Sequence, residues 1–266
     1  MDNFVFVGGG HLATALITGL IKNGSSPNAI QVFDRNQEKL DYFYKTYQVN
    51  GSTLFSDMLP DAILVLAVRP KDVKNIAEII QKNQSARIIS CVAGLSVSQL
   101  CKITKREKSQ VVRAMPNLPA IVQAGVTGLY ADPEVIPEVK NTAERLFRSV
   151  GTVNWLADED LMHALTAVSG SGPGYVFRLM QSLYLAAMKQ GFSADQAKSL
   201  VSDSFLGAAK MALNSPNDFK SLCDMVCVPG GTTTAGVNVL NEANIDDLFK
   251  KVIDAATERS KNLIEN

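Results

Sequence analysis

A run of three glycines after a short apolar segment is the feature that most constrains this chain. Residues 4–7 read FVFV, Gly8-Gly9-Gly10 follows, and the next residues repeat apolar side chains at helical spacing. The stretch Gly8–Ala13 fits the pattern G-x-G-x-x-A. In that pattern the first glycine permits a tight turn, the second lets a pyrophosphate approach the backbone, and the alanine lets helix and strand pack closely.

The start of the helix adds free N–H groups and a partial positive charge, which attract phosphate. We therefore predict a dinucleotide site here, and a purely structural turn is the alternative. The residues assigned to the cofactor are Gly8, Gly10, His11, Leu12 and Ala13.

Strand-like and helical segments alternate over about the first 150 residues. Further short apolar runs occupy Ile30–Phe33, Ala62–Val68, Arg87–Ala93 and Val111–Ala114. Ala62–Val68 is apolar at every position, which is typical of a central parallel strand covered on both faces. The alternation predicts an α/β fold with a Rossmann-like doubly wound sheet, which we assign to residues 1–157.

From Asp158 onward the patterns are almost wholly helical, for example at Tyr175–Lys189, Ala194–Asn214 and Ile245–Leu263. The segment Tyr175–Lys189 is apolar around much of its circumference, so it must be deeply buried, and a helical domain of this size has little interior. We therefore expect residues 158–266 to form an all-α domain that packs against a second subunit.

Composition excludes several classes of protein. The 26 acidic and 26 basic residues balance, so no net charge attracts nucleic acid or a lipid surface. No apolar run approaches the roughly 20 residues of a membrane span, and the first residues do not resemble a signal peptide. Four scattered cysteines indicate reduced thiols, so a cytoplasmic protein is expected. Cys223 and Cys227 have helical i,i+4 spacing, but too few histidines accompany them, and no metal site is expected.

The residues after the second and fourth apolar runs should contact the cofactor. Asp34 would accept hydrogen bonds from a free ribose 2′-hydroxyl, which favours NAD, whereas Arg35 would pair with a 2′-phosphate, which favours NADP. The two signals conflict; NADPH is favoured, NADH is the alternative, and a solvated turn pair is the structural alternative. Ala67-Val68-Arg69-Pro70 closes the fourth run over the cofactor side of the sheet.

The helical half contains two glycine-rich turns, each followed by a helix. They read Ser169-Gly170-Ser171-Gly172-Pro173-Gly174 and Pro229-Gly230-Gly231-Thr232-Thr233-Thr234. Each could offer successive backbone N–H groups to an anion. Taken alone, either is more simply explained as a helix-breaking turn.

Taken together, these motifs resemble one family in the correct order along nearly the whole chain, that of pyrroline-5-carboxylate reductase. The matching segments are Gly8–Ala13, Ala67–Pro70, Arg113–Asn117, Ser169–Pro173, Gly207–Met211 and Asp224–Thr233. The resemblance implies a Rossmann-like domain, a helical dimerisation domain and intertwined homodimers that often assemble further. It also implies hydride transfer from NAD(P)H to the imine carbon of 1-pyrroline-5-carboxylate, which gives L-proline.

The resemblance also assigns roles to residues. It implies that Val228, Pro229, Gly230, Gly231 and Thr232 cradle the substrate carboxylate and that Thr233 bonds the ring nitrogen. Ser169, Gly170, Ser171 and Gly172 would line the pocket floor, and Asn117 would join the cofactor site. Such a reaction needs little acid–base machinery, because the nicotinamide carries the hydride.

Three departures from the common family pattern leave alternatives open. Val228 replaces a frequent serine, Leu118 a threonine and Arg69 a lysine. A weakly active or silent NAD(P)-binding paralogue is therefore one alternative. A β-hydroxyacid dehydrogenase is another, but such enzymes need a lysine early in the helix after the substrate loop. Here the first basic residue is Arg178, which disfavours that reading.

Overall fold

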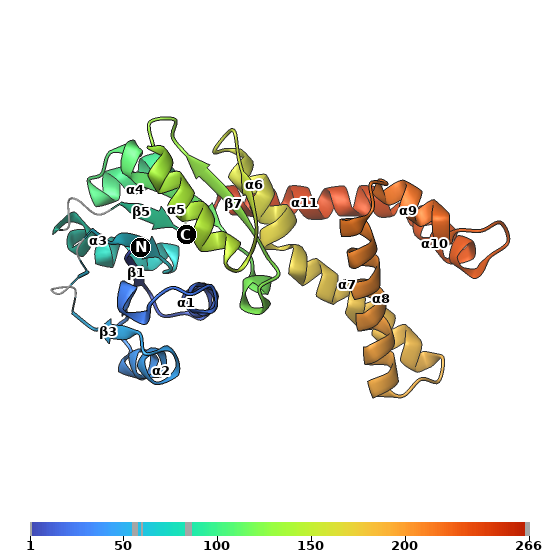
Figure 1. Cartoon of the computed structure of the whole chain (residues 1–266). Helices are drawn as coiled ribbons and strands as arrows, with labels where there is room; N and C mark the ends of the chain where they lie inside the picture. Colours follow the sequence, from blue (N-terminus) through green and yellow to red (C-terminus); the bar gives the residue numbers. More distant parts are fainter. Residues whose placement is uncertain (1, 55–57, 60, 83–86, 264–266) are drawn as a thin grey trace. The chain divides into compact units, whose positions relative to one another are not determined.

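The computed structural model describes residues 2–54, 58–59, 61–82 and 87–263, and the chain forms two compact units (Figure 1). The first unit comprises Met1–Pro173 and Ala255–Asn266, and the second comprises Gly174–Asp254. Helix α7 (Gly172–Lys189) begins in the first unit, and helix α11 (Ile245–Lys261) ends there.

An eight-stranded sheet forms the centre of the first unit, in the order β3-β2-β1-β4-β5-β6-β7-β8. Neighbouring strands are parallel except for the antiparallel pair β6 and β7. The strands are β1 (Phe4–Val7), β2 (Ile30–Phe33), β3 (Asn50–Ser52), β4 (Ile63–Leu66), β5 (Ile88–Ser90), β6 (Val111–Met115), β7 (Gly125–Ala131) and β8 (Gly151–Trp155). The doubly wound sheet and its five apolar strands were predicted correctly, whereas β3, β7 and β8 were not anticipated.

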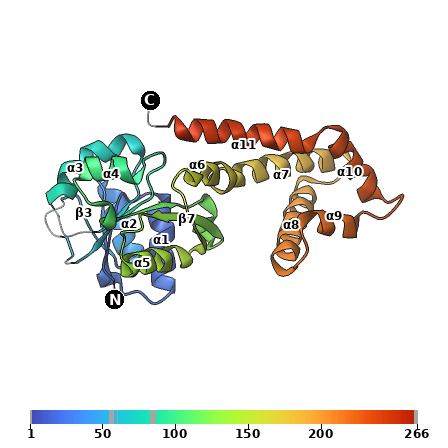
Figure 2. The ribbon, with the colours of Figure 1, turned by 90° about the horizontal axis from the view of Figure 1, so that it is seen from above.

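Helices cover both faces of the sheet. They are α1 (His11–Lys22), α2 (Gln37–Tyr47), α3 (Val73–Lys82), α4 (Val97–Thr104) and α5 (Pro137–Arg148). Alternate residues of β1 face opposite sides: Phe4 and Phe6 pack with α1, α2 and α5, while Val5 and Val7 pack with α3 and α4. Figure 2 shows α3 and α4 on one side of the sheet and α5 on the other. This two-sided burial explains why FVFV is apolar at every position.

Short helical segments connect these elements. Four are short 3₁₀ helices, namely η1 (Pro27–Ala29), η2 (Pro70–Asp72), η3 (Lys108–Gln110) and η4 (Leu118–Val122). After β8 the chain enters α6 (Leu161–Leu165) and a π-helical turn, η5 (Thr166–Gly170). Leu165 lies over Gly128 of β7, where an added Cβ would come within 2.4 Å of the leucine Cδ1. The segment that follows residue 157 therefore packs on the sheet. The domain boundary at 157/158 stays a prediction.

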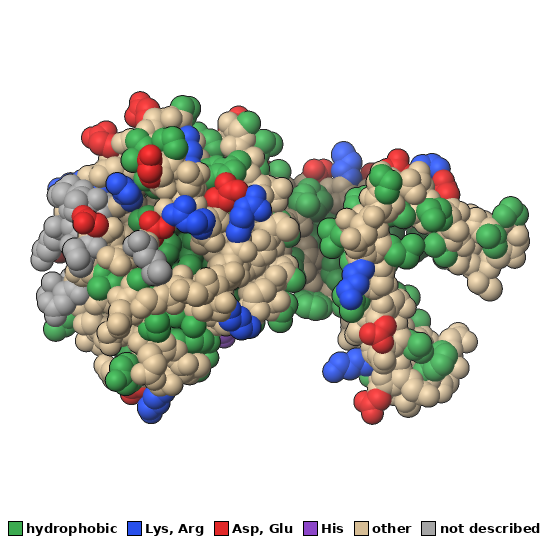
Figure 3. All heavy atoms as spheres, in the orientation of Figure 1, with side chains coloured by type: hydrophobic (Ala, Val, Ile, Leu, Met, Phe, Trp, Pro, Cys, Tyr) green, Lys and Arg blue, Asp and Glu red, His purple; other side chains and the backbone are tan. Residues whose placement is uncertain are grey.

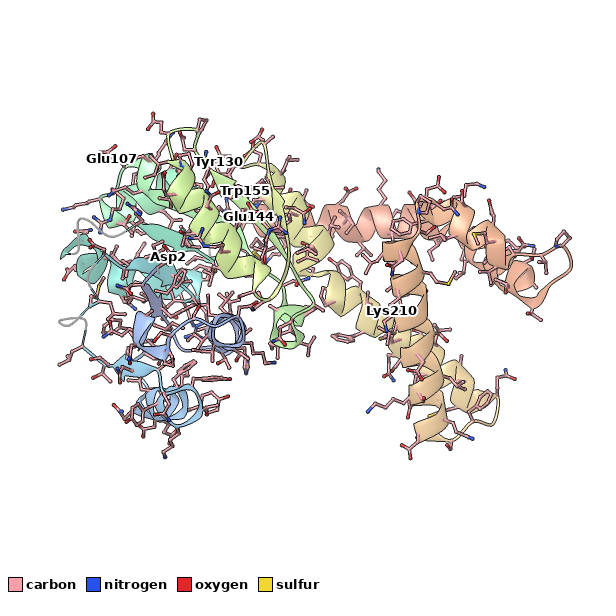
Figure 4. All side chains as sticks on the ribbon, viewed as in Figure 1. Asp2, Glu107, Tyr130, Glu144, Trp155 and Lys210 are labelled. Atoms are coloured by element: carbon pink, nitrogen blue, oxygen red, sulfur yellow. The ribbon has the colours of Figure 1, made fainter. Side chains whose placement is uncertain are left out.

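The outer strand β8 is fastened to α5 through a tryptophan. The indole N–H of Trp155 donates a hydrogen bond of 2.9 Å to Glu144, which also pairs with Arg148 at 2.7 Å. These two hydrogen bonds lower the pKa of Glu144, Trp155 contributing most. Figure 4 shows Trp155 and Glu144 projecting toward one another.

The second unit is helical. Besides most of α7, it contains α8 (Ala194–Asn214), α9 (Phe219–Val226), α10 (Thr232–Glu242) and the first part of α11. The bounds of α8 are those predicted, and a capping box between Ser193 and Gln196 fixes its start.

Large apolar side chains are exposed throughout this unit, as Figure 3 shows along α8, α9 and α10. On α7, the side chains of Phe177 and Leu183 are 60% and 52% exposed. Large apolar side chains exposed in such number are typical of a surface that contacts another protein. Among the described helices, none combines the length and apolar character required to cross a bilayer.

Candidate active site

The first glycine of the turn is held between two strands. The N–H of Gly8 donates a hydrogen bond of 2.8 Å to the carbonyl of Phe33, at the end of β2. Its φ is +100°, and an added Cβ would lie 2.7 Å from the carbonyl oxygen of Ala67, just after β4. Both the dihedral and the close approach require glycine here.

The middle glycine is tied to Asp34. The N–H of Gly9 donates to Oδ2 of Asp34 at 2.8 Å, the N–H of Asn36 donates to Oδ1 at 2.9 Å, and Lys39 donates to Oδ2 at 3.1 Å. Burial raises the pKa of Asp34, but these hydrogen bonds and the lysine charge outweigh burial and lower it. Asp34 is therefore ionised, and its hydrogen bond from Gly9 stabilises the glycine turn.

The third glycine opens toward solvent. Gly10 is the N-cap of α1, no side chain caps the helix, and an added Cβ at Gly10 would meet no atom within 4 Å. The first N–H groups of α1 are thus free to bind an anion, as the motif predicted. The predicted residue Ala13 is fully buried in the core, where its small size lets α1 approach the sheet.

A cavity of about 640 Å³ lies beside this turn. The predicted cofactor residues that line it are Gly8, Gly10, His11, Asp34, Arg35, Ala67, Val68 and Arg69. Because parallel strands present their carboxyl ends at one edge of the sheet, the ends of β1, β2 and β4 meet here. Pro70 is the first residue of η2, as expected, but β4 already ends at Leu66, and Pro70 does not line the cavity.

Three basic side chains surround this cavity. Arg35 and Arg69 both approach Asp72, with Arg35 Nη2 at 3.5 Å from Oδ1 and Arg69 Nε at 3.0 Å from Oδ2. Lys39 completes the group and pairs with Asp34. The sequence analysis did not identify Lys39 or Asp72. Lys39 lies in the first turn of α2, which follows Arg35, and Asp72 lies in η2, which follows Arg69. This short distance in sequence from a predicted cofactor residue is the signal that could have identified both residues.

A second cavity, of about 250 Å³, lies on the other side of the α1 start and shares His11 with the first. It is lined by Leu12, Cys91, Met115, Asn117 and Leu118, among others. Burial raises the pKa of Cys91 to about 12, so this thiol stays protonated. The predicted residues Leu12 and Asn117 thus adjoin a small, largely apolar space at the helix start.

The predicted floor residues Ser169–Gly172 form the end of the π-turn and the start of α7. The Asn117 amide donates to the carbonyl of Ser169 at 2.9 Å, and an added Cβ at Gly170 would lie 3.1 Å from Cε of Met115. The structure therefore brings this floor segment together with the Met115–Asn117 loop.

The second glycine-rich turn belongs to the helical unit. The N–H of Gly231 donates to the carbonyl of Val228 at 2.9 Å, and Gly230 has a φ of +74°, so Pro229 and Gly230 occupy the centre of a type II turn. Helix α10 starts at Thr232 without a side-chain cap, so its first N–H groups are available to an anion.

One further hydroxyl, which the sequence analysis did not single out, braces this turn. Thr234 Oγ1 donates to the carbonyl of Val228 at 2.7 Å, while Thr233, one residue earlier, is half-buried. Close to the turn, the sulfur atoms of Cys223 and Cys227 lie 3.9 Å apart. Among the described residues, no group of three or more His, Cys, Asp or Glu side chains is placed to bind a metal.

Comparisons with family models match both parts of the chain. A model described as pyrroline-5-carboxylate reductase dimerisation matches residues 159–263. A model described as NADP oxidoreductase, coenzyme F420-dependent, matches residues 3–94. The glycine turn, Asp34, Arg35 and Arg69 fall within the second match, and both glycine-rich turns of the helical half fall within the first.

Full-length relatives agree with these matches. The chain is 34% identical to the pyrroline-5-carboxylate reductase of Pasteurella multocida, over 97% of this chain and 96% of that one. It is 38% identical to a solved pyrroline-5-carboxylate reductase from Coxiella burnetii, with a TM-score of 0.92 and 98% of each chain covered. The pyrroline carboxylate reductase of Plasmodium falciparum, solved with NADP bound, is 26% identical with a TM-score of 0.85, over 99% of this chain and 98% of that one.

These matches confirm the fold class and the family resemblance that the motifs indicated. The identity exceeds 30% over nearly the full length of both chains, so these relatives match the sheet unit and the helical unit together. The chain belongs to the pyrroline-5-carboxylate reductase family.

Proposed function

We propose that the chain reduces 1-pyrroline-5-carboxylate to L-proline with NADPH, the last step of proline biosynthesis. The observation that carries the proposal is the cavity beside the uncapped start of α1, in a chain related over its full length to pyrroline-5-carboxylate reductases. When bound, the nicotinamide supplies the hydride. The protein's part is to hold the cofactor and the cyclic imine in contact and in the right orientation.

The choice of NADPH rests on the charges around the first cavity. Asp34 is the residue that would favour NADH, but its carboxylate already accepts hydrogen bonds from Gly9, Asn36 and Lys39. Among the residues that the structure describes, Arg35 and Arg69 at the same cavity share one acidic partner, Asp72. A ribose 2′-phosphate offers these guanidinium groups a dianionic ligand.

For the substrate, we assign the turn Val228–Gly231 and the start of α10 to the carboxylate. Free N–H groups at a helix start suit a carboxylate, and the glycine-rich turn leaves them uncovered. Thr233 is the residue we assign to the ring nitrogen: a hydroxyl can accept a hydrogen bond from the protonated imine and can still donate to the amine product. Ser169, Gly170, Ser171 and Gly172 form the floor in this proposal.

The assembly in this proposal is a homodimer through the helical unit. Its support is the exposed apolar surface of α7 to α10, together with the dimerisation model that matches residues 159–263. Further association of dimers, which the family resemblance implies, would appear in light scattering as a mass above that of the dimer. A cytoplasmic location fits four cysteines that are free in this structure.

A purified sample tests the reaction directly. With NADPH and pyrroline-5-carboxylate, loss of the reduced-cofactor absorbance and formation of proline are expected. Tight NADPH binding without oxidation would instead identify a silent paralogue. Oxidation with 2-keto or 3-keto acids, but not with the imine, would identify a hydroxyacid dehydrogenase.

A further inference from the structure

The side chain of Asn117 joins three segments that are distant in sequence. Its Nδ2 donates to the backbone carbonyl of Ser169 at 2.9 Å, and its Oδ1 accepts the N–H of Val126 at 2.8 Å. Asn117 follows β6, Val126 lies in β7, and Ser169 lies in the π-turn η5. The carboxamide is therefore fixed at both ends by backbone groups of the protein.

The segment that Asn117 holds has an unusual backbone. In η5 the N–H of Ser171 donates to the carbonyl of Thr166 at 2.8 Å, five residues back, and Ser169 Oγ donates to the carbonyl of Leu165 at 3.1 Å. Single π-turns are rare, and they occur often at functional sites. Pro173, four residues after Ser169, has no N–H to donate to the Ser169 carbonyl, and Asn117 donates to that carbonyl instead.

The π-turn η5 also packs against a residue that lines the smaller cavity. At Gly170 an added Cβ would lie 3.1 Å from Cε of Met115, so the turn packs closely on the end of β6. Met115 and Asn117 both line the 250 Å³ cavity next to the start of α1. The hydrogen bond to Ser169 thus fixes the distance between this cavity and the Ser169–Gly172 segment.

We propose that Asn117 is a positioning residue: its amide holds the π-turn so that Ser169–Gly172 can meet the substrate beside the cofactor. This inference rests on the proposed function, in which Ser169–Gly172 form the substrate floor. It differs from the role that the resemblance implied for Asn117, which was contact with the cofactor. A residue that acts through the turn affects the imine more than it affects NADPH.

Asn117→Asp is the sharpest test, because the acid has the same shape and can still accept from Val126, but as a carboxylate it cannot donate to Ser169. We expect amide hydrogen exchange in residues 166–172 to become at least about tenfold faster, with exchange in α4 unchanged. We expect kcat/KM for pyrroline-5-carboxylate to fall roughly 10- to 100-fold, the size of a lost buried hydrogen bond. The Kd for NADPH should change less than about threefold. Asn117→Ala should match these losses, and the same amide-to-acid change at Asn141, an exposed residue of α5, should cause none (Asn141→Asp).

Unchanged exchange in residues 166–172 would overturn the inference. So would a loss of NADPH affinity as large as the loss of turnover, because that result identifies a cofactor contact. Faster exchange with normal imine kinetics would also overturn it. If the wild-type protein does not reduce the imine, the proposed function fails, and the exchange experiment still decides whether Asn117 holds the turn.

Discussion

The backbone N–H of Gly9 donates a hydrogen bond of 2.8 Å to Oδ2 of Asp34, and this contact joins the Gly8–Gly10 turn to the end of β2. Asp34 also accepts from Asn36 and Lys39, so both carboxylate oxygens are engaged. The residue that a sequence motif would assign to the ribose therefore has a structural role as well, because it sets the position of the glycines around it.

The hydrogen bonds that the Asp34 carboxylate accepts predict that the stability of the fold depends on pH. The folded-state pKa of Asp34 lies below its ordinary value of 3.8, so the ionised carboxylate favours the folded state. That contribution is fully present above pH 3.8 and is lost as pH falls through the folded-state pKa. In urea unfolding, Asp34→Asn should cost on the order of 1–3 kcal/mol between pH 5 and pH 8. The difference from the wild type should shrink below pH 3.8. Asp41→Asn, an exposed change on α2, is the control.

The first and third glycines of the turn should respond differently to a methyl group. Gly8→Ala places a Cβ 2.7 Å from a backbone oxygen at a φ of +100°, so we expect a loss of stability of about 1–3 kcal/mol and a lower Tm. Gly10→Ala meets no protein atom, so its Tm should stay within a few degrees. Its Kd for NADPH should nevertheless rise at least about tenfold, because the methyl group would occupy the space that we assign to the pyrophosphate. Equal effects of the two changes on Tm would contradict this assignment.

Arg35 should set the preference for NADPH. If its guanidinium pairs with the 2′-phosphate, Arg35→Gln should lower kcat/KM for NADPH by roughly 10- to 100-fold, as loss of a charge-assisted hydrogen bond does. The value for NADH should change less than about threefold. The matched control is Lys45→Gln, which removes an exposed charge from the far end of α2. Equal losses with both cofactors would remove Arg35 from phosphate recognition.

The sequence predicted the centre of the fold better than its edges, for a physical reason. Strands buried on both faces, such as β1 and β4, are continuously apolar and can be recognised locally. Strand β3 reads Asn-Gly-Ser and β8 is partly exposed, so neither has that pattern. The antiparallel strand β7 is defined by its pairing with β6 and β8, and such long-range pairing leaves little trace in local sequence.

The candidate site likewise has features that local sequence predicts and contacts that depend on the fold. The tight turn at Gly8 and the uncapped helix start after Gly10 could be predicted from the motif, because local sequence determines both features. The partners of Asp34 and Asn117 could not, because they depend on which backbone groups the fold brings within 3 Å. No sequence spacing indicates that Asn117 bonds Ser169, 52 residues away.

The apolar surface of the helical unit predicts an obligatory dimer. Light scattering at micromolar concentration should give at least twice the chain mass of 28.7 kDa. Phe177 is 60% exposed on α7, so Phe177→Asp should place an unpaired charge in the interface and shift the sample toward monomers. Tyr44→Asp, at a residue 55% exposed on the sheet unit, should leave the mass unchanged. A wild-type monomer under these conditions would refute the proposed assembly.

Three consecutive threonines at the start of α10 allow the proposed catalytic hydroxyl to be isolated. Thr233→Ala should lower kcat by roughly 10- to 100-fold, because the ring nitrogen loses its hydrogen-bond partner in the transition state. The Kd for NADPH should not change. Thr232→Ala keeps the backbone N–H that we assign to the carboxylate, so it should alter kcat less than about threefold.

Thr234→Ala removes the 2.7 Å bond to the carbonyl of Val228 and should act mainly on KM for the imine, because it loosens the turn without touching the reacting atoms. A split of this kind, with kcat following Thr233 and KM following Thr234, separates the reacting hydroxyl from the one that braces the loop. If Thr233→Ala turned over normally while Thr234→Ala did not, the ring nitrogen would have to find its partner elsewhere.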